Sequence, residues 1–189
     1  MLNQPELIHR LKNGDPSVFT DIVTQWQNMV YNTALSIVQN ETDAEDITQD
    51  VFIEVYEKAE QFRGDALLST WIYRITINKA LDLQRKKKRQ KNGGLLQKIF
   101  AVKEEDEPVD FDHPGVQLDN KEKAGMLFKA LKKLPENQQA AFTLHKMEGL
   151  TYQEMAEVME ISLSAAEGLM VRAKAGLKKT LEHYYSTRD

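Results

Sequence analysis

A stretch near the middle of the chain, residues 92–120, interrupts an otherwise helix-friendly sequence. Apolar side chains stop recurring there at the three- and four-residue steps of a helix, and residues 104–119 hold seven acids, two prolines and one glycine. Such a composition buries too little apolar surface to fold alone. The 189-residue sequence therefore predicts two small domains, 1–91 and 121–189, joined by a flexible acidic linker at 92–120.

Four residues inside this linker, Leu95, Leu96, Ile99 and Phe100, form an apolar patch. The patch is compatible with a short helix or with docking on one of the domains, and the sequence leaves both open.

Outside the linker, prolines and glycines fall between segments of helical periodicity, so we expect an all-α fold. The first domain should hold four helices. One spans residues 5–13, and the next is capped by Asp15 with Pro16 in its first turn. A third begins with a capping box at Thr42 and Glu45, and a fourth runs from about Ser69 into a basic stretch.

The second domain should contain helices at 121–134 and 135–148, followed by two more helices that a short turn separates. Capping boxes at 151–154 and 164–167, with a turn at 160–163 between them, predict a helix-turn-helix. We expect its core to contain Leu150, Met155, Ala156, Ile161, Leu169 and Met170. The bases Arg172, Lys174, Lys178 and Lys179 are expected to end the second helix and can neutralise DNA phosphates. A plain packing hairpin is the alternative.

Charge is strongly segregated along the first domain. Residues 41–60 hold eight acids and one base, whereas residues 79–91 hold seven bases and one acid. The acidic segment suits a basic partner and the basic segment an acidic one. The helix expected at 70–79, TWIYRITINK, mixes aromatic rings, an amide and bases, which is the chemistry that binds unpaired bases. The alternatives are a solvated basic tail and a Trp71 that belongs mostly to the core.

Catalytic and cofactor chemistry finds few candidates. The chain has no cysteine, four scattered histidines, no phosphate-binding loop and no nucleophile motif. Glu45, Asp46 and Asp50 share a helix face, but no loop supplies further oxygens for a cation. We therefore expect no enzymatic activity, no cofactor and no metal site. No apolar run reaches the 18 to 20 residues of a membrane span, and MLNQPELIHR lacks the apolar stretch of a secretory signal. These features predict a cytoplasmic protein with no stable membrane insertion.

Taken together in their order, the motifs resemble extracytoplasmic-function sigma factors, the smallest members of the sigma-70 family. The segment at 43–56, DAEDITQDVFIEVY, looks like region 2.2. This resemblance implies docking on the coiled-coil clamp of the RNA polymerase β′ subunit. The polymerase-binding residues it implies are Asp43, Asp46, Gln49, Asp50 and Glu54.

The segments FRGD at 62–65 and TWIYRITINKALD at 70–82, followed by the basic run, resemble regions 2.3 and 2.4. The family's role for these regions is to open the −10 promoter element and capture its non-template strand. A pocket for a flipped base is then expected at residues 61–69. The implied DNA-binding residues are Arg63, Trp71, Arg74, Asn78, Lys79, Arg85, Lys86 and Lys87.

The segments LPENQQ at 134–139, EGLTYQEMAE at 148–157 and RAK at 172–174 resemble region 4. That region reads the −35 element and meets the β flap of polymerase. The residues implied here are Thr151, Tyr152, Ser164, Ala165, Glu167, Gly168, Arg172 and Lys174. Glu167 and Leu169 depart from the bases of many relatives, so we expect weak duplex binding by this domain alone.

The resemblance also implies an anti-sigma factor that holds the two domains inactive. Two other functions compete with the sigma-factor interpretation. One is a transcriptional regulator that binds duplex DNA through its helix-turn-helix, and the other is a polymerase-binding scaffold without promoter recognition. Asn78, Trp71 and Tyr73 beside the basic run favour the sigma factor, because an ordinary regulator does not bind unpaired bases.

Overall fold

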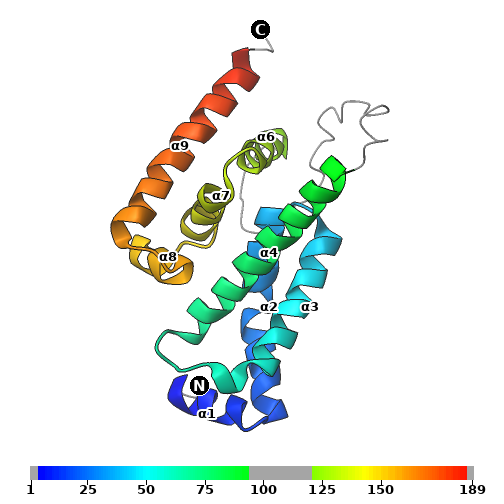
Figure 1. Ribbon diagram of the computed structural model, residues 1–189, viewed down its shortest axis with the longest axis vertical. Coiled ribbons are helices and arrows are strands. Elements are labelled where there is room, and N and C mark those ends of the chain that lie inside the picture. The colour runs from blue at the N-terminus through cyan, green and yellow to red at the C-terminus, as the bar shows by residue number, and fades with distance from the viewer. Residues whose placement is uncertain (1–3, 94–120, 187–189) are drawn as a thin grey trace.

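The structure, a computed structural model, describes residues 4–93 and 121–186. These residues form two groups of helices, α1 to α4 and α6 to α9, which lie against each other along α4 (Figure 1). We call them the N-terminal and the C-terminal bundle. All regular elements in the described ranges are helical, so the predicted all-α fold with two small helical domains is confirmed. Residues 94–120 of the predicted linker, which include its apolar patch, lie outside the described residues.

The N-terminal bundle consists of α1 (Gln4–Lys12), α2 (Pro16–Val38), α3 (Glu41–Glu57), the short 3₁₀ turn η1 (Ala59–Gln61) and α4 (Leu68–Gly93). Helices α2, α3 and α4 pack against one another, and α1 covers the start of α2. Their shared core includes the fully buried Val18, Ile22, Val30, Val51 and Ile72. Burial of each such side chain contributes about 1.5–3 kcal/mol, which makes this core the main support of the bundle.

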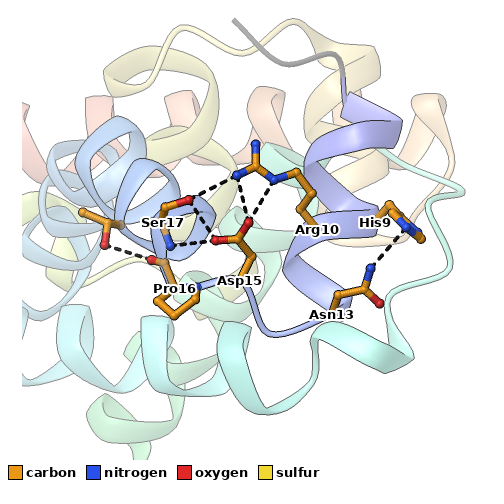
Figure 2. Close-up of polar contacts among 7 residues, drawn as sticks. His9, Arg10, Asn13, Asp15, Pro16 and Ser17 are labelled. Carbon is orange, nitrogen blue, oxygen red and sulfur yellow. Dashed lines mark hydrogen bonds and ion pairs between the residues drawn. The ribbon is translucent and has the colours of Figure 1, made fainter.

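The corner between α1 and α2 follows the sequence prediction (Figure 2). Asp15 caps α2 by accepting a hydrogen bond from the Ser17 backbone N–H at 2.9 Å, and Pro16 occupies the first turn. Arg10, at the end of α1, forms an ion pair with Asp15 at 2.8 Å. The hydrogen bonds from Arg10 and Ser17 lower the pKa of Asp15 to about 2. The cap therefore stays ionised throughout the physiological range.

Helix α3 begins earlier than predicted. Its N-cap is Asn40, whose side chain accepts a hydrogen bond from the Asp43 N–H at 2.9 Å, so the capping box expected at Thr42 and Glu45 is wrong. The preceding residue, Gln39, ends α2 in the left-handed region with φ 55°. This tight reversal leaves Asn40 as the first residue with extended geometry, which is the geometry an N-cap requires.

The C-terminal bundle consists of α6 (Lys121–Lys132), α7 (Glu136–Phe142), a π-helical turn η2 (Thr143–Met147), α8 (Tyr152–Met159) and α9 (Leu163–Ser186). Helix α9 packs against α6, α7 and α8. Met155, Ala156 and Met170 are buried in its core, and Leu150, Ile161 and Leu169 pack against that core half-buried. These six residues are those expected from the sequence.

The two caps of the helix-turn-helix have different outcomes. The capping box at Thr151 is confirmed, because the Thr151 Oγ1 accepts from the Glu154 N–H at 3.2 Å and Glu154 accepts from the Thr151 N–H at 2.8 Å. The box expected at Ser164 is wrong. Ser162 occupies the cap position instead and accepts from the Ala165 N–H at 3.2 Å.

Helix α9 is also longer than predicted. It runs 24 residues to Ser186, so Arg172 and Lys174 lie in its middle rather than at its end.

None of the helices within residues 4–93 and 121–186 is long and apolar enough to cross a membrane.

The two bundles share one hydrophobic core cluster, which joins side chains of α2 and α4 to side chains of α7, η2 and α8. Polar contacts seal its edge. The buried Gln139 side chain donates to the Ile37 carbonyl at 3.1 Å, and the Gln39 side chain donates to the Phe128 carbonyl at 2.8 Å. The bundles are therefore closed on each other in this structure.

Candidate protein and nucleic-acid interfaces

The acidic side chains of α3 divide into an exposed and an engaged set. Asp46, Gln49 and Asp50 are exposed, and Gln49 and Asp50 lie three and four residues after Asp46, so all three share one helix face. Asp43 forms an ion pair with Lys87, and Glu54 forms ion pairs with Lys58 at 2.6 Å and Lys79 at 2.9 Å. Of the five residues predicted to bind polymerase, three are available on this face and two hold the N-terminal bundle together.

The engaged carboxylate of Glu54 shows how α3 is attached to α4. Burial raises its pKa, whereas the hydrogen bonds and charges of Lys58 and Lys79 lower it by more, so the net pKa lies below the ordinary value. Glu54 therefore remains an anion between two cations.

The exposed face of α3 carries two apolar side chains that the sequence reasoning missed. Ile53 is 55% exposed and Tyr56 is 53% exposed, and they continue the spacing of Asp46, Gln49 and Asp50. We call these five residues the α3 stripe. The sequence does indicate that Ile53 is exposed, because it lies off the helix face defined by Ile47, Val51 and Val55. Large exposed apolar residues rimmed by charge are typical of protein interfaces.

Four predicted DNA-binding residues lie together on α4. Trp71, Arg74 and Asn78 follow one another at the three- and four-residue spacing of a single helix face, and with Lys79 they line one surface groove. Trp71 is half-buried and stacks on Phe62 with ring centroids 4.8 Å apart. One ring face of Trp71 therefore packs on Phe62, while the side chain still lines the groove.

The loop before α4 borders a larger cavity of about 820 Å³. Arg63 is exposed on this loop, and Gly64 adopts φ +84°, which favours glycine at this turn. The cavity lies where the pocket at 61–69 was expected, and its opposite wall consists of α8 and the start of α9. The residues that line it include Gln61, Phe62, Arg63, Trp71, Arg74, Gln153, Glu157, Glu160 and Leu163.

Arg74 is directed at the C-terminal bundle. Its guanidinium donates to the backbone carbonyls of Glu157 at 2.8 Å and Val158 at 3.3 Å, and it forms an ion pair with Glu160 at 2.9 Å. These carbonyls belong to the last turn of α8, where an arginine complements the negative end of the helix dipole. A residue predicted to contact the −10 element is therefore occupied by α8.

The basic run at the end of α4 is also partly neutralised. Arg85 forms ion pairs with Asp82 at 2.8 Å and with Glu136 of α7 at 2.7 Å, and Lys87 pairs with Asp43. Lys86 and Lys88 are exposed. Of the three basic residues predicted here, only Lys86 is without a partner among the ion pairs of the described residues.

The predicted −35 residues lie around the helix-turn-helix. Thr151, Ser164, Ala165, Glu167, Arg172 and Lys174 are exposed. Tyr152 is half-buried and stacks on His145 with ring centroids 4.4 Å apart. The Arg172 guanidinium lies over Gly168, where Nη1 would come within 3.3 Å of an added Cβ. Sequence reasoning missed the exposed apolar Leu163 and Val171 on the same helix.

A half-buried carboxyl between the bundles was not singled out from the sequence. Glu148 follows the π-helical turn η2, and its Oε2 accepts a hydrogen bond from the Tyr73 hydroxyl of α4 at 3.2 Å. Burial raises the pKa of Glu148 to about 7, although the hydroxyls of Tyr73 and Thr33 act in the opposite sense. Burial and the negative charge of Glu148 together raise the pKa of Tyr73.

The model for sigma-70 region 2 matches residues 22–90, and the model for sigma-70 region 4 matches residues 124–177. The chain belongs to the sigma-70 family. The region 2 match covers most of α2, all of α3 and nearly all of α4, whereas the region 4 match extends from α6 into α9.

Individual relatives refine the assignment of this sigma factor. It is 29% identical over 187 residues to the extracytoplasmic-function RNA polymerase sigma-E factor of Haemophilus influenzae, with 96% of each chain covered. Among solved structures, it is similar to CnrH in the complex with the cytosolic domain of CnrY (22% identity, TM-score 0.68, 95% and 97% covered). It is also similar to RpoE in complex with the anti-sigma factor NepR from Bartonella quintana (21%, TM-score 0.63, 87% and 96% covered). The chain is thus an alternative RNA polymerase sigma factor of the extracytoplasmic-function group.

Proposed function

We propose that this sigma factor docks on the β′ clamp of core RNA polymerase through the α3 stripe. The match of sigma regions 2 and 4, in order, carries the proposal. The exposed Asp46, Gln49 and Asp50 supply negative charge for a basic partner, and Ile53 and Tyr56 supply apolar area. A charged rim around exposed apolar side chains suits an interface with few energetic hot spots.

The −10 element is then captured by the groove of Trp71, Arg74 and Asn78 together with the loop that holds Arg63. Extruding a base from the duplex costs a few kcal/mol, so a preformed pocket with stacking and hydrogen-bonding groups is needed. Phe62 supports Trp71 from behind, which fixes the indole for stacking. Lys79, Arg85, Lys86 and Lys87 follow the phosphate backbone.

The −35 element is read by the exposed start of α9, with Ser164, Ala165, Glu167 and Gly168 at the bases. Arg172 and Lys174 contact phosphates, and Thr151 and Tyr152 position the first helix of the motif. Guanine is not expected to dominate this element, because no arginine or lysine occupies the first two turns of α9. The β flap of polymerase meets the other surface of the C-terminal bundle.

An anti-sigma factor is the third proposed partner. RpoE, which this chain resembles in fold, was solved in complex with the anti-sigma factor NepR. The sigma factor itself performs no catalysis, needs no cofactor or metal, and acts in the cytoplasm where polymerase and promoter DNA meet.

Transcription with purified components tests the proposal. The sigma factor is added to core polymerase with fragmented genomic DNA, and transcripts that share an upstream motif are expected. Asp46→Arg should weaken binding to core polymerase by roughly thirtyfold or more, the loss of one hot spot of about 2 kcal/mol. Asp21→Arg, at an exposed position of α2, is the matched control. Absence of any promoter-dependent transcript would refute the proposal.

A further inference from the structure

One flank of α4 holds both the candidate −10 residues and the contacts to the C-terminal bundle. Arg74 is bound by the last turn of α8, and its neighbour Tyr73 donates to Glu148. The cavity beside the 61–66 loop is walled by Glu157 and Glu160. An extended DNA strand cannot occupy this flank while α8 lies on it. The closed arrangement therefore withholds Arg74 and the groove beside it from DNA, whereas Arg63 and Asn78 remain exposed.

The Glu148 carboxyl lies at this closed interface, against α4 and α2. It is reached by the Tyr73 hydroxyl from α4, and the Thr33 side chain of α2 is buried next to it. The Thr33 hydroxyl lies close enough to lower the pKa of Glu148, but among the described residues the aligned hydrogen bond to its carboxyl comes from Tyr73. On its own segment, the His145 ring bonds to the Leu150 carbonyl rather than to Glu148.

No nearby positive charge offsets the cost of removing an ionised Glu148 from water, among the described residues. Among the described residues no cation forms an ion pair with it, and the next carboxylate, Glu154 of α8, acts on Tyr73 by raising the pKa of its phenol. An ionised carboxylate in such a place has lost water without gaining a positive partner, which is unfavourable. A neutral carboxyl avoids this penalty.

We propose that Glu148 is a pH-operated latch: its neutral form holds the bundles closed over the DNA-facing flank of α4, and its ionised form releases them. The inference rests on the proposed role of α4 in −10 binding, but the latch itself is a property of the isolated chain. Release frees Arg74 from α8 and opens the cavity between α8 and the 61–66 loop.

The direction of the pH effect follows from two pKa values. In the closed arrangement burial raises the pKa of Glu148 to about 7, whereas an exposed glutamate has the ordinary value of 4.5. The closed state thus binds the proton more tightly, and closure is strongest below pH 4.5. Each pH unit between these values changes the ratio of closed to open molecules by up to tenfold, and the gain is lost above about pH 7. From pH 5.5 to 8 the ratio should fall roughly thirtyfold.

The distance between the bundles tests the latch directly. The chain has no cysteine, so Asp21→Cys on α2 and Lys179→Cys on α9 allow two spin labels to be placed at exposed positions. Pulsed electron paramagnetic resonance measures the distance between the two labels. The population with the longer distance should grow from pH 5.5 to pH 8. Glu148→Gln, a neutral carboxamide of the same size, should stay closed at both pH values. Glu182→Gln on α9, whose side chain is 67% exposed, should behave like the parent.

Two results would overturn the latch. One is a distance distribution that does not change with pH in the parent, and the other is an equal change in Glu148→Gln. Circular dichroism at each pH confirms that the helices persist, so unfolding is not mistaken for opening. The labelled chain is measured without DNA or polymerase. The result for the latch therefore does not depend on the −10 proposal. A failure of the −10 proposal would be seen in a separate measurement, as a holoenzyme that does not bind a forked promoter at pH 8.

Discussion

The Arg74 guanidinium lies 2.9 Å from the Glu160 carboxylate, and this pair joins the proposed −10 surface to the end of α8. Glu160 adopts φ 54°, a left-handed conformation that turns the chain from α8 into the recognition helix α9. The same turn that shapes the helix-turn-helix thus points a carboxylate at the N-terminal bundle.

This ion pair should add little to closure. The Glu160 side chain is 67% exposed, and exposed pairs contribute about 1 kcal/mol or less. Glu160→Gln is expected to raise the open population by at most about fivefold in the spin-label experiment. Glu157→Gln is the control, because Glu157 contacts Arg74 only through its backbone carbonyl. A much larger effect of Glu160→Gln would mean that the pair, rather than the buried contacts, holds the bundles together.

Ile53→Ser should weaken binding to core polymerase by about tenfold or more while the melting temperature stays nearly constant. Ile53 is 55% exposed, so its apolar area is available to a partner and adds little to the core. Affinity is measured by titration with labelled core enzyme, and stability by thermal unfolding. Val171→Ser, which removes an exposed apolar side chain from α9, provides the comparison. Equal affinities for both variants would remove the α3 stripe from the polymerase interface.

Lys86 and Lys88 should contribute to the salt dependence of promoter binding. Both are exposed, and each phosphate contact adds about 0.7 to 0.9 to the slope of log affinity against log salt. The double change to alanine should lower the slope of holoenzyme binding to a forked promoter by about 1.4 to 1.8. Fluorescence anisotropy at several salt concentrations provides the slope. If it is unchanged, these lysines do not contact phosphates and are merely solvated.

Glu167→Lys should strengthen binding of the sigma factor to duplex DNA and increase the salt slope by about 0.9. Glu167 is exposed on the second turn of α9, where a negative charge repels phosphates. Glu182→Lys makes the same charge change four turns further along the helix and should have a smaller effect. If both variants gain equally, the start of α9 does not enter the groove.

Local signals in the sequence predicted most of the fold. Asp15 followed by Pro16, and Thr151 three residues before Glu154, mark helix starts that the structure confirms. The two wrong caps have a common cause. Gln39 and Glu160 each end the preceding helix in the left-handed region, although neither is glycine, and the next helix therefore begins at once. The residue types at these positions did not indicate that the chain reverses there.

The exposure of the candidate site followed less well from the sequence. The spacing of Trp71, Arg74 and Asn78 placed them on one face of α4, but it could not show that Arg74 binds carbonyls more than 80 residues away. The contact of Tyr73 with Glu148 is of the same kind. Such pairs depend on how the bundles pack, and helical periodicity reports only which face of each helix is buried.

Helix α4 both presents the proposed reading groove and receives α8. A substitution at Arg74 that adapts the protein to a different promoter would also alter how readily the molecule opens. Promoter preference and resting activity would then be inherited together, and a lineage that changes one of these traits must adjust the other elsewhere in the chain.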